Sequence, residues 1–130
     1  MIVVDASVIA PAVADDGPDG DQARAHLRGQ QLLAPELLDL EVTSVIRTTL
    51  AGGGLDNRRA KLALDDLSSL DIRRIRHSQL LARVWELRGN LTPYDAVYVA
   101  LAETARCALL TADTRLGRAP GPKCRIQVLG

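Results

Sequence analysis

Short apolar runs alternate with longer segments of helical periodicity along this chain. An apolar run bounded by turn residues is typical of a strand buried on both faces, whereas apolar residues three and four positions apart are typical of an amphipathic helix. The runs predict strands at Met1–Val4, Leu32–Ala34, Asp71–Ile75, Cys107–Leu110 and Arg125–Leu129. Strands that alternate with helices in this way predict an α/β fold with a parallel sheet and right-handed crossovers.

Helix boundaries are predicted from capping residues and breakers. The predicted helices are Ser7–Ala14, Gln22–Arg28, Pro35–Thr49, Arg58–Leu67, Gln79–Arg88 and one that begins at Thr92. Pro35 suits the first turn of a helix, and Asn57 and Ser78 are N-cap residue types. The apolar stripe expected on the fifth helix consists of Leu81, Val84, Trp85 and the stem of Arg88.

The composition predicts one domain with an aliphatic core. The chain has 130 residues, of which 47% are hydrophobic, and it contains no Phe. A chain of this length buries roughly two-thirds of its unfolded surface in a single domain. Because the formal net charge is zero, the overall field gives no reason to expect strong nonspecific binding to nucleic acid. Any contact with a polyanion must come from local basic patches.

The cysteines and the apolar segments bear on the compartment. Cys107 and Cys124 are too few for a disulfide framework, which favours a reducing cytoplasm. The amino terminus lacks the basic region and long apolar stretch of a signal peptide. No segment approaches the roughly 20 apolar residues that cross a bilayer, so no membrane span is predicted.

Two acidic residues lie just beyond the carboxyl ends of predicted strands. Asp5 comes after the first strand, and Asp113 comes shortly after the strand that begins at Cys107. The carboxyl ends of parallel strands border the ligand crevice of an open sheet, so both carboxylates are candidate site residues. The structural alternative for each is a turn or N-cap residue, which βα junctions commonly use. For Asp5 the site interpretation is favoured, because Ser7 offers a second oxygen nearby.

Two further acidic residues fall in predicted helices. Glu41 lies in an apolar stripe, where an unpaired carboxylate needs an Arg partner, protonation or a cation. Asp95 stands three residues after Thr92, the spacing of a capping box, which alone would explain an acidic residue in the first turn. A carboxylate has two oxygens, so a cap does not exclude a metal ligand.

The four carboxylates together indicate a particular chemistry. If they converge, their repulsion raises their pKa values unless a cation neutralises the site. Oxygen ligands without His or Cys select a hard ion, Mg²⁺ or Mn²⁺. The reaction that fits is hydrolysis of a phosphodiester by a metal-activated water. His26 and His77 lie in polar surroundings and are expected on the surface.

The same residues carry a resemblance to a known family. The segments Met1–Ser7, Pro35–Val42, Leu91–Ala102 and Leu110–Leu116 resemble, in this order, the motifs of PIN-domain ribonucleases, closest to the VapC toxins of bacterial toxin–antitoxin pairs. The resemblance spans nearly the whole chain. It implies a single PIN domain over residues 1–130, folded as a three-layer α/β/α sandwich with a central parallel sheet.

The resemblance also implies roles and partners. Asp5 and Asp95 would be the principal ligands of Mg²⁺, for which Mn²⁺ can substitute, and Glu41 and Asp113 would complete the catalytic pocket. The implied protein is a homodimeric endoribonuclease that cleaves RNA and is neutralised by a cognate VapB-like antitoxin. On this view Asp5→Asn and Asp95→Asn would each abolish cleavage and spare the fold.

Several supporting residues are expected from the same motifs. Ser7 and Thr111 match positions that support the pocket through hydroxyl contacts, and Arg115 is a candidate contact for RNA phosphates. Ser44 departs from the family pattern, which often has Asn there, so a side-chain contact from that position is not expected.

Other classes fit the sequence less well. Aspartyl-phosphate hydrolases need a second Asp two residues after the first, where this chain has Ser7. A phosphoacceptor receiver domain needs an acidic pair near the first strand and a late Lys, but Lys123 lies in a proline-rich turn. The remaining alternative is a catalytically silent PIN-like binding module.

Overall fold

All five strands run parallel in one sheet of order β3-β2-β1-β4-β5. The computed structural model describes residues 1–130. The strands are β1 (Ile2–Val4), β2 (Leu32–Pro35), β3 (Ile72–Ile75), β4 (Ala108–Thr111) and β5 (Ile126–Val128). Each overlaps a run that the hydrophobic pattern predicts, so the predicted parallel sheet is confirmed.

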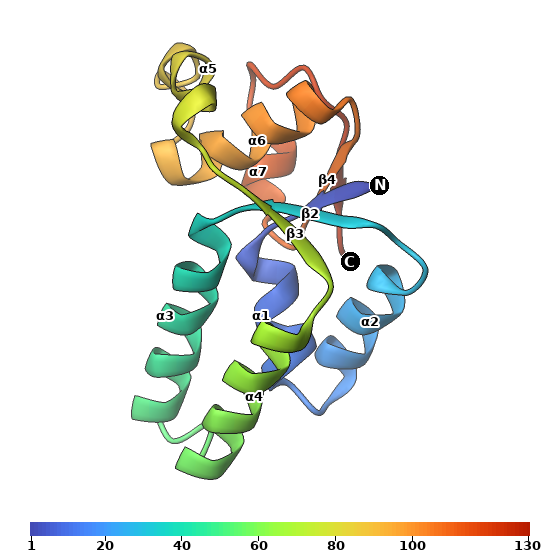
Figure 1. Cartoon of the computed structure of the whole chain (residues 1–130), viewed down its shortest axis with the longest axis vertical. Coiled ribbons are helices and arrows are strands. Elements are labelled where there is room, and N and C mark those ends of the chain that lie inside the picture. Colours follow the sequence, from blue (N-terminus) through green and yellow to red (C-terminus); the bar gives the residue numbers. More distant parts are fainter.

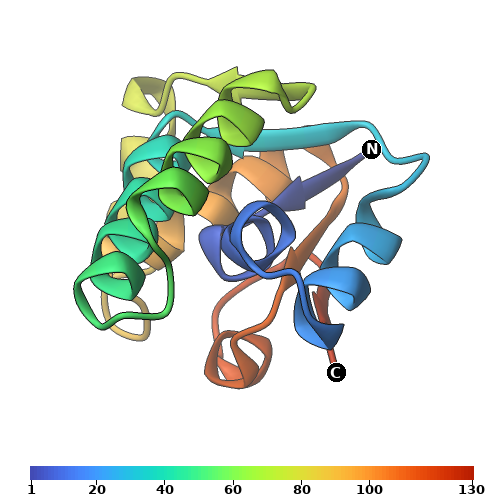
Figure 2. The same cartoon turned by 90° about the horizontal axis from the view of Figure 1, so that it is seen from below.

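Helices cover both faces of this sheet (Figure 1). The helices are α1 (Ala6–Ala14), α2 (Pro18–Leu27), α3 (Leu37–Ala51), α4 (Asn57–Ser69), α5 (Leu81–Glu86), α6 (Pro93–Ala105) and α7 (Thr114–Arg118). Figure 1 shows α1 to α4 below the strands and α5 and α6 above them. Figure 2, seen from below, looks onto the first group, with α6 lying beyond the sheet. The three-layer α/β/α sandwich is therefore confirmed.

The strand order places a switch point between β1 and β4. The chain leaves β1 toward β2 on one side and returns later to β4 on the other side. At such a point the crossovers diverge to opposite faces and leave a crevice outside the carboxyl ends of the strands. Asp5 follows β1 here, and its backbone N–H donates to the carbonyl of Leu110 at 3.3 Å.

The core is aliphatic and centred on β1, β4 and α6. Val3, Val4 and Leu109 are fully buried, as expected for central strands of a parallel sheet. Helix α6 is buried from Ala96 to Ala102 because it crosses β1, β2 and β4. Its alanines let the backbone approach the sheet closely. The start of α6 is thereby fixed at the carboxyl edge of the sheet.

Two predicted helix starts are wrong. Pro35 is the last residue of β2, and α3 begins at Leu37. Helix α2 begins at Pro18, not at Gln22, so the Pro-Asp-Gly segment that resembles a breaker is its first turn. Proline suits this position, and the acidic side chain of Asp19 interacts favourably with the helix dipole. Gly20 permits the tight junction with α1, because a Cβ there would lie 1.8 Å from the carbonyl oxygen of Asp15.

The segment expected as a helix over Gln79–Arg88 is shorter and differently phased. A 3₁₀ turn over Ser78–Leu80 precedes α5, and this turn rotates the apolar face relative to a continuous α-helix. Leu80, Val84 and Leu87 are therefore buried, whereas Leu81 and Trp85 of the predicted stripe are 54% and 67% exposed. Arg88 stacks over the Trp85 ring, 4.4 Å from its centroid.

Only one of the three predicted N-caps is observed, and Ser78 is not a cap, since it is the first residue of the 3₁₀ turn, whose N-cap position is His77. Thr92 caps α6, while α4 is capped by Asp56 and not by Asn57. The Asp56 carboxylate accepts from the backbone N–H of Arg59 at 2.7 Å. None of the helices combines the length and apolar character needed to traverse a bilayer.

Candidate active site

Asp5 is the most buried of the four acidic residues, with 8% of its surface exposed. Its backbone leaves β1 in an extended conformation and caps α1. Oδ1 accepts from the backbone N–H of Ser7 at 3.0 Å and from the Ser7 hydroxyl at 2.5 Å. Oδ2 accepts from the Thr111 hydroxyl at 2.5 Å. The cap interpretation is thus correct, and it coexists with a carboxylate held at the switch point.

Both hydroxyls are oriented by the end of β4. The Ser7 hydroxyl accepts from the backbone N–H of Ala112 at 2.8 Å, and the Thr111 hydroxyl accepts from that of Asp113 at 3.1 Å. Each hydroxyl has a single proton, which these acceptor roles leave free to point at Asp5. Burial raises the pKa of Asp5, while these hydrogen bonds partly offset that rise. The network joins β1 to β4 around one carboxylate.

Glu41 projects from the second turn of α3 and is half-buried. No Arg pairs with it. Its partner is Tyr98 of α6, whose hydroxyl donates to Oε1 at 2.5 Å. Burial raises the pKa of Glu41, the Tyr98 hydrogen bond lowers it, and the charges of Asp95 and Asp5 raise it. The Arg partner considered from the sequence is therefore replaced by a phenol.

Asp95 lies in the first turn of α6. Its backbone N–H donates to the Thr92 hydroxyl at 3.3 Å, which is one half of a capping box. Burial raises the pKa of its carboxyl group first, and the charge of Asp113 raises it further. The Thr92 hydroxyl and Arg115 act in the opposite direction. Asp95 thus has far fewer hydrogen-bond donors than Asp5, so its oxygens are the more available for a ligand.

Asp113 is the N-cap of α7 and the most solvated of the four. It accepts from the backbone N–H of Arg115 at 2.9 Å and pairs with the guanidinium of that residue at 3.3 Å. Arg115 lowers the pKa of Asp113, so this carboxylate is ionised over a wider range than the other three. The side chain of Arg115 is 88% exposed, which leaves much of its guanidinium accessible.

The structure brings the four carboxylates into one electrostatic neighbourhood. The charge of Asp95 raises the pKa values of Asp5 and Glu41. The charge of Asp5 also raises the pKa of Glu41, and that of Asp113 raises the pKa of Asp95. No three acidic, histidine or cysteine side chains form a ready-made cage for an ion. A hydrated Mg²⁺ ion does not require such a cage, because it keeps several waters and is bound through one or two carboxylates.

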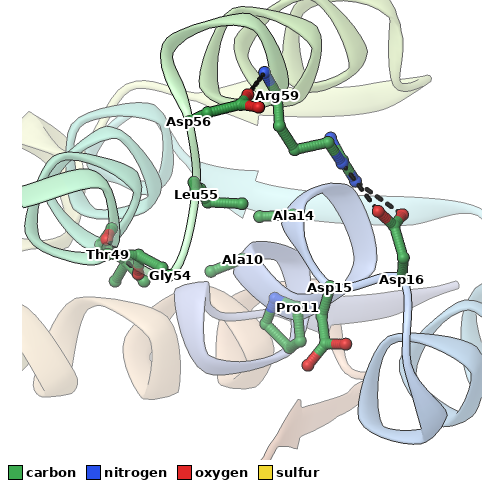
Figure 3. Close-up of a pocket in the computed structure, with 11 residues that line it drawn as sticks. Ala10, Pro11, Ala14, Asp15, Asp16, Thr49, Gly54, Leu55, Asp56 and Arg59 are labelled. Atoms are coloured by element: carbon green, nitrogen blue, oxygen red, sulfur yellow. Dashed lines mark hydrogen bonds and ion pairs between the residues drawn. The ribbon is translucent and has the colours of Figure 1, made fainter. Parts of the chain in front are cut away.

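A hollow in the surface lies away from the four acidic residues (Figure 3). It has a volume of about 640 Å³ between α1, α3 and the start of α4, and contains none of the four acidic site residues. Figure 3 shows Arg59 spanning its rim, with ion-pair contacts to Asp16 and a backbone contact to Asp56. This hollow is therefore not the site that the four carboxylates define.

Tyr98 is the polar contact that sequence reasoning missed. Its spacing from Tyr94 and Leu101 is typical of the apolar face of a helix, and the residue is indeed only 2% exposed. One signal was available, since Tyr98 stands three residues after Asp95 and thus on the same side of the helix. A buried tyrosine hydroxyl normally has a hydrogen-bond partner.

Comparison with known proteins places the chain in a family. The model of the PIN-domain family matches this chain over residues 2–122. The chain therefore belongs to the PIN-domain family. Among its relatives, Ribonuclease VapC9 of Mycobacterium tuberculosis is 40% identical over 129 residues, which cover 99% of this chain and 98% of that protein. Ribonuclease VapC1 of the same species is 40% identical over 128 residues, which cover 98% and 96%.

Solved structures share the fold at low sequence identity. VapBC2 from Rickettsia felis, bound to a DNA fragment from its promoter, superposes with a TM-score of 0.73 at 14% identity, with full coverage of both chains. The sarcin–ricin-loop-cleaving toxin VapC20 of Mycobacterium tuberculosis gives 0.71 at 15% identity, covering 91% of this chain and 94% of that chain. At these identities the likeness supports the architecture alone.

The raised pKa values predict an unusual dependence of stability on pH. Asp5, Glu41 and Asp95 have higher pKa values folded than their unfolded values of 3.8 for Asp and 4.5 for Glu. Such groups stabilise the fold while protonated, and this stabilisation is lost as the pH rises through their folded pKa values. The lowered pKa of Asp113 acts only below its unfolded value, so it does not oppose this trend.

We therefore expect the metal-free protein to become more stable as the pH falls from neutrality toward 4.5, the unfolded value for Glu. Thermal unfolding at a series of pH values measures this, and Asp95→Asn should flatten the profile because one carboxyl group is removed. An unfolding midpoint that decreases as the pH is lowered over this range, in metal-free buffer, would contradict the raised pKa values of the three carboxyl groups.

Proposed function

We propose that this protein is a divalent-metal-dependent endoribonuclease and the toxin of a VapBC-type toxin–antitoxin pair. Two observations support the proposal: the charges of Asp5, Glu41, Asp95 and Asp113 act pairwise on one another's pKa values, and the chain is 40% identical to VapC ribonucleases. These carboxylates come from four separate elements, and burial raises the pKa values of three of them.

The donor set favours Mg²⁺, with Mn²⁺ as a substitute. The site offers carboxylate and hydroxyl oxygens, which suit hard cations. Asp95 and Asp5 would hold the ion, Asp95 directly and Asp5 as an oriented, hydrogen-bonded carboxylate. When bound, the cation would offset negative charge that develops on the phosphate and lower the pKa of water.

The side chains perform the remaining steps. Glu41 has a raised pKa and only one oxygen bonded to the protein, so it suits the removal of a proton from the attacking water. The water oxygen bonds to phosphorus as the bond from phosphorus to the leaving sugar oxygen breaks, and that oxygen then takes up a proton. Arg115, on the rim beside Asp113, would contact a phosphate of the RNA.

Two protein partners complete the proposal. The first is a VapB-like antitoxin that covers the four carboxylates and places an Arg side chain against them. The second is another copy of this chain. Its contact surface would include the exposed apolar residues Leu40, Leu81 and Trp85, which are 72%, 54% and 67% exposed. The cytoplasm is the proposed compartment, and the free thiols Cys107 and Cys124 fit its reducing conditions.

Incubation of the purified chain with total RNA tests the proposed activity. We expect cleavage with Mg²⁺ or Mn²⁺, none after chelation with EDTA, and recovery when the metal is added back, because the carboxylates alone cannot neutralise the phosphate. Mapping of the new RNA ends would define the target. Cleavage that persists in EDTA would contradict the metal-dependent mechanism, and the absence of cleavage with every metal would favour the binding-module alternative.

A further inference from the structure

The contact between Glu41 and Tyr98 joins two helices that lie on opposite faces of the sheet. Glu41 comes from α3 and Tyr98 from α6, and Figure 1 shows these helices below and above the strands. Their side chains are in contact, with 2.5 Å between the Tyr98 hydroxyl and Oε1 of Glu41. This is the only hydrogen bond between the protein and the Glu41 carboxylate.

Burial of the Tyr98 hydroxyl costs free energy, because a polar group is removed from water. The tyrosine is only 2% exposed and lies in the buried stretch of α6 from Ala96 to Ala102. A phenylalanine would fill the same space without burying a polar atom, so the fold does not require the oxygen for packing. Burial, and then the neighbouring Glu41 carboxylate, raise the pKa of Tyr98 far above its ordinary range. The phenol therefore remains a proton donor.

The second oxygen of Glu41 is left open. Oε2 has no hydrogen-bond partner in the protein, and no buried side-chain oxygen or nitrogen in the structure lacks a partner. Oε2 must therefore reach solvent. The charges of Asp95 and Asp5, the proposed cation ligands, also raise the pKa of Glu41, so the three carboxyl groups interact.

We propose that Tyr98 is a positioning residue for the nuclease reaction, which fixes Oε1 of Glu41 so that Oε2 is presented to water or to a hydrated cation beside Asp5 and Asp95. This inference rests on the proposed function. Without the hydroxyl, a half-buried glutamate on an apolar stripe has no donor to hold one rotamer, and its carboxylate occupies several orientations. Groups that orient a metal-site carboxylate typically contribute about 10- to 100-fold in affinity or activity.

The test is Tyr98→Phe, with Tyr94→Phe as the matched control. Tyr94 lies one turn earlier on α6, is 62% exposed, and loses the same oxygen in the control. We expect Tyr98→Phe to lower kcat about tenfold with little change in KM for RNA, and to weaken Mn²⁺ binding about tenfold by electron paramagnetic resonance titration. Tyr94→Phe should match the wild-type protein in each measurement.

A double-mutant cycle separates positioning from damage to the fold. In the background of Glu41→Ala, the change Tyr98→Phe should have no further effect on kcat or on Mn²⁺ affinity, because the group that Tyr98 orients is gone. Equal losses in both backgrounds would overturn the proposal, as would a Tyr98→Phe protein within twofold of wild type in both measurements. If the wild-type protein cleaves no RNA, the proposed function fails, and the Mn²⁺ titrations alone then decide whether Tyr98 acts through Glu41.

Discussion

Replacement of Asp95 by Asn is expected to lower RNA cleavage by about a thousandfold or more and to leave the fold intact. A bound cation contributes several kcal/mol to the transition state, and each 1.36 kcal/mol is about tenfold in rate. Asp95 has few hydrogen-bond donors and a raised pKa, so its amide costs the fold little and removes repulsion from Asp113. Single-turnover cleavage of RNA in Mg²⁺ measures the loss, and circular dichroism checks the fold.

Asp56→Asn is the matched control for this substitution. Asp56 also lies at a helix start, as the N-cap of α4, where Asn caps as well as Asp. It loses the same charge away from the acidic edge, so cleavage should be unchanged. Undiminished Mg²⁺-dependent cleavage by a homogeneous Asp95→Asn protein would rule out the mechanism.

Asp5→Asn does not isolate the loss of a metal ligand, although the sequence suggests that it would. The expectation that this change spares the fold treats Asp5 and Asp95 alike. Asp5, however, accepts hydrogen bonds from Ser7 and Thr111 on both oxygens. In asparagine, one of these two acceptor oxygens becomes an NH₂ donor, and it would face a hydroxyl that is itself a donor to this position. Loss of activity in that variant would combine a lost ligand with a disturbed network.

Thr111→Val is expected to destabilise the protein by about 2–4 kcal/mol, since it removes a buried hydrogen bond to a carboxylate and leaves a backbone N–H without its acceptor. Thr111 is fully buried, and its hydroxyl joins Asp5 to the N–H of Asp113. Valine has nearly the same shape, so packing is preserved. The loss of orientation at Asp5 should also lower cleavage by about 10- to 100-fold. Urea unfolding in metal-free buffer measures the first effect.

Thr111→Ser is the control for this second substitution. Serine keeps the hydroxyl and loses one methyl group, so the change in stability should be about 1 kcal/mol and cleavage should be largely retained. If Thr111→Val unfolds within about 0.5 kcal/mol of the wild-type protein, the hydroxyl does not support Asp5 in the way the structure indicates.

Helix starts show where local signals succeed and fail. Thr92 followed by Pro93 correctly marks the start of α6, because a cap depends on neighbours within one turn. The start of α2 at Pro18 was missed, since the same Pro-Gly composition serves both a loop and a first helical turn. The phase of α5 was also missed, because the 3₁₀ turn before it depends on how Leu80 and Leu87 pack into the core.

The sequence by itself determined the parallel sheet and the positions of Asp5 and Asp113 at the ends of β1 and β4. Apolar runs and caps act over a few residues, so their pattern suffices to place strand ends. Only the tertiary structure decided how each carboxylate is held: Asp5 by three donors from two segments, Glu41 by Tyr98 across the sheet, and Asp95 with few donors. These differences arise because hydrogen-bond partners far apart in the chain meet only after the layers have packed, and no local pattern records that meeting.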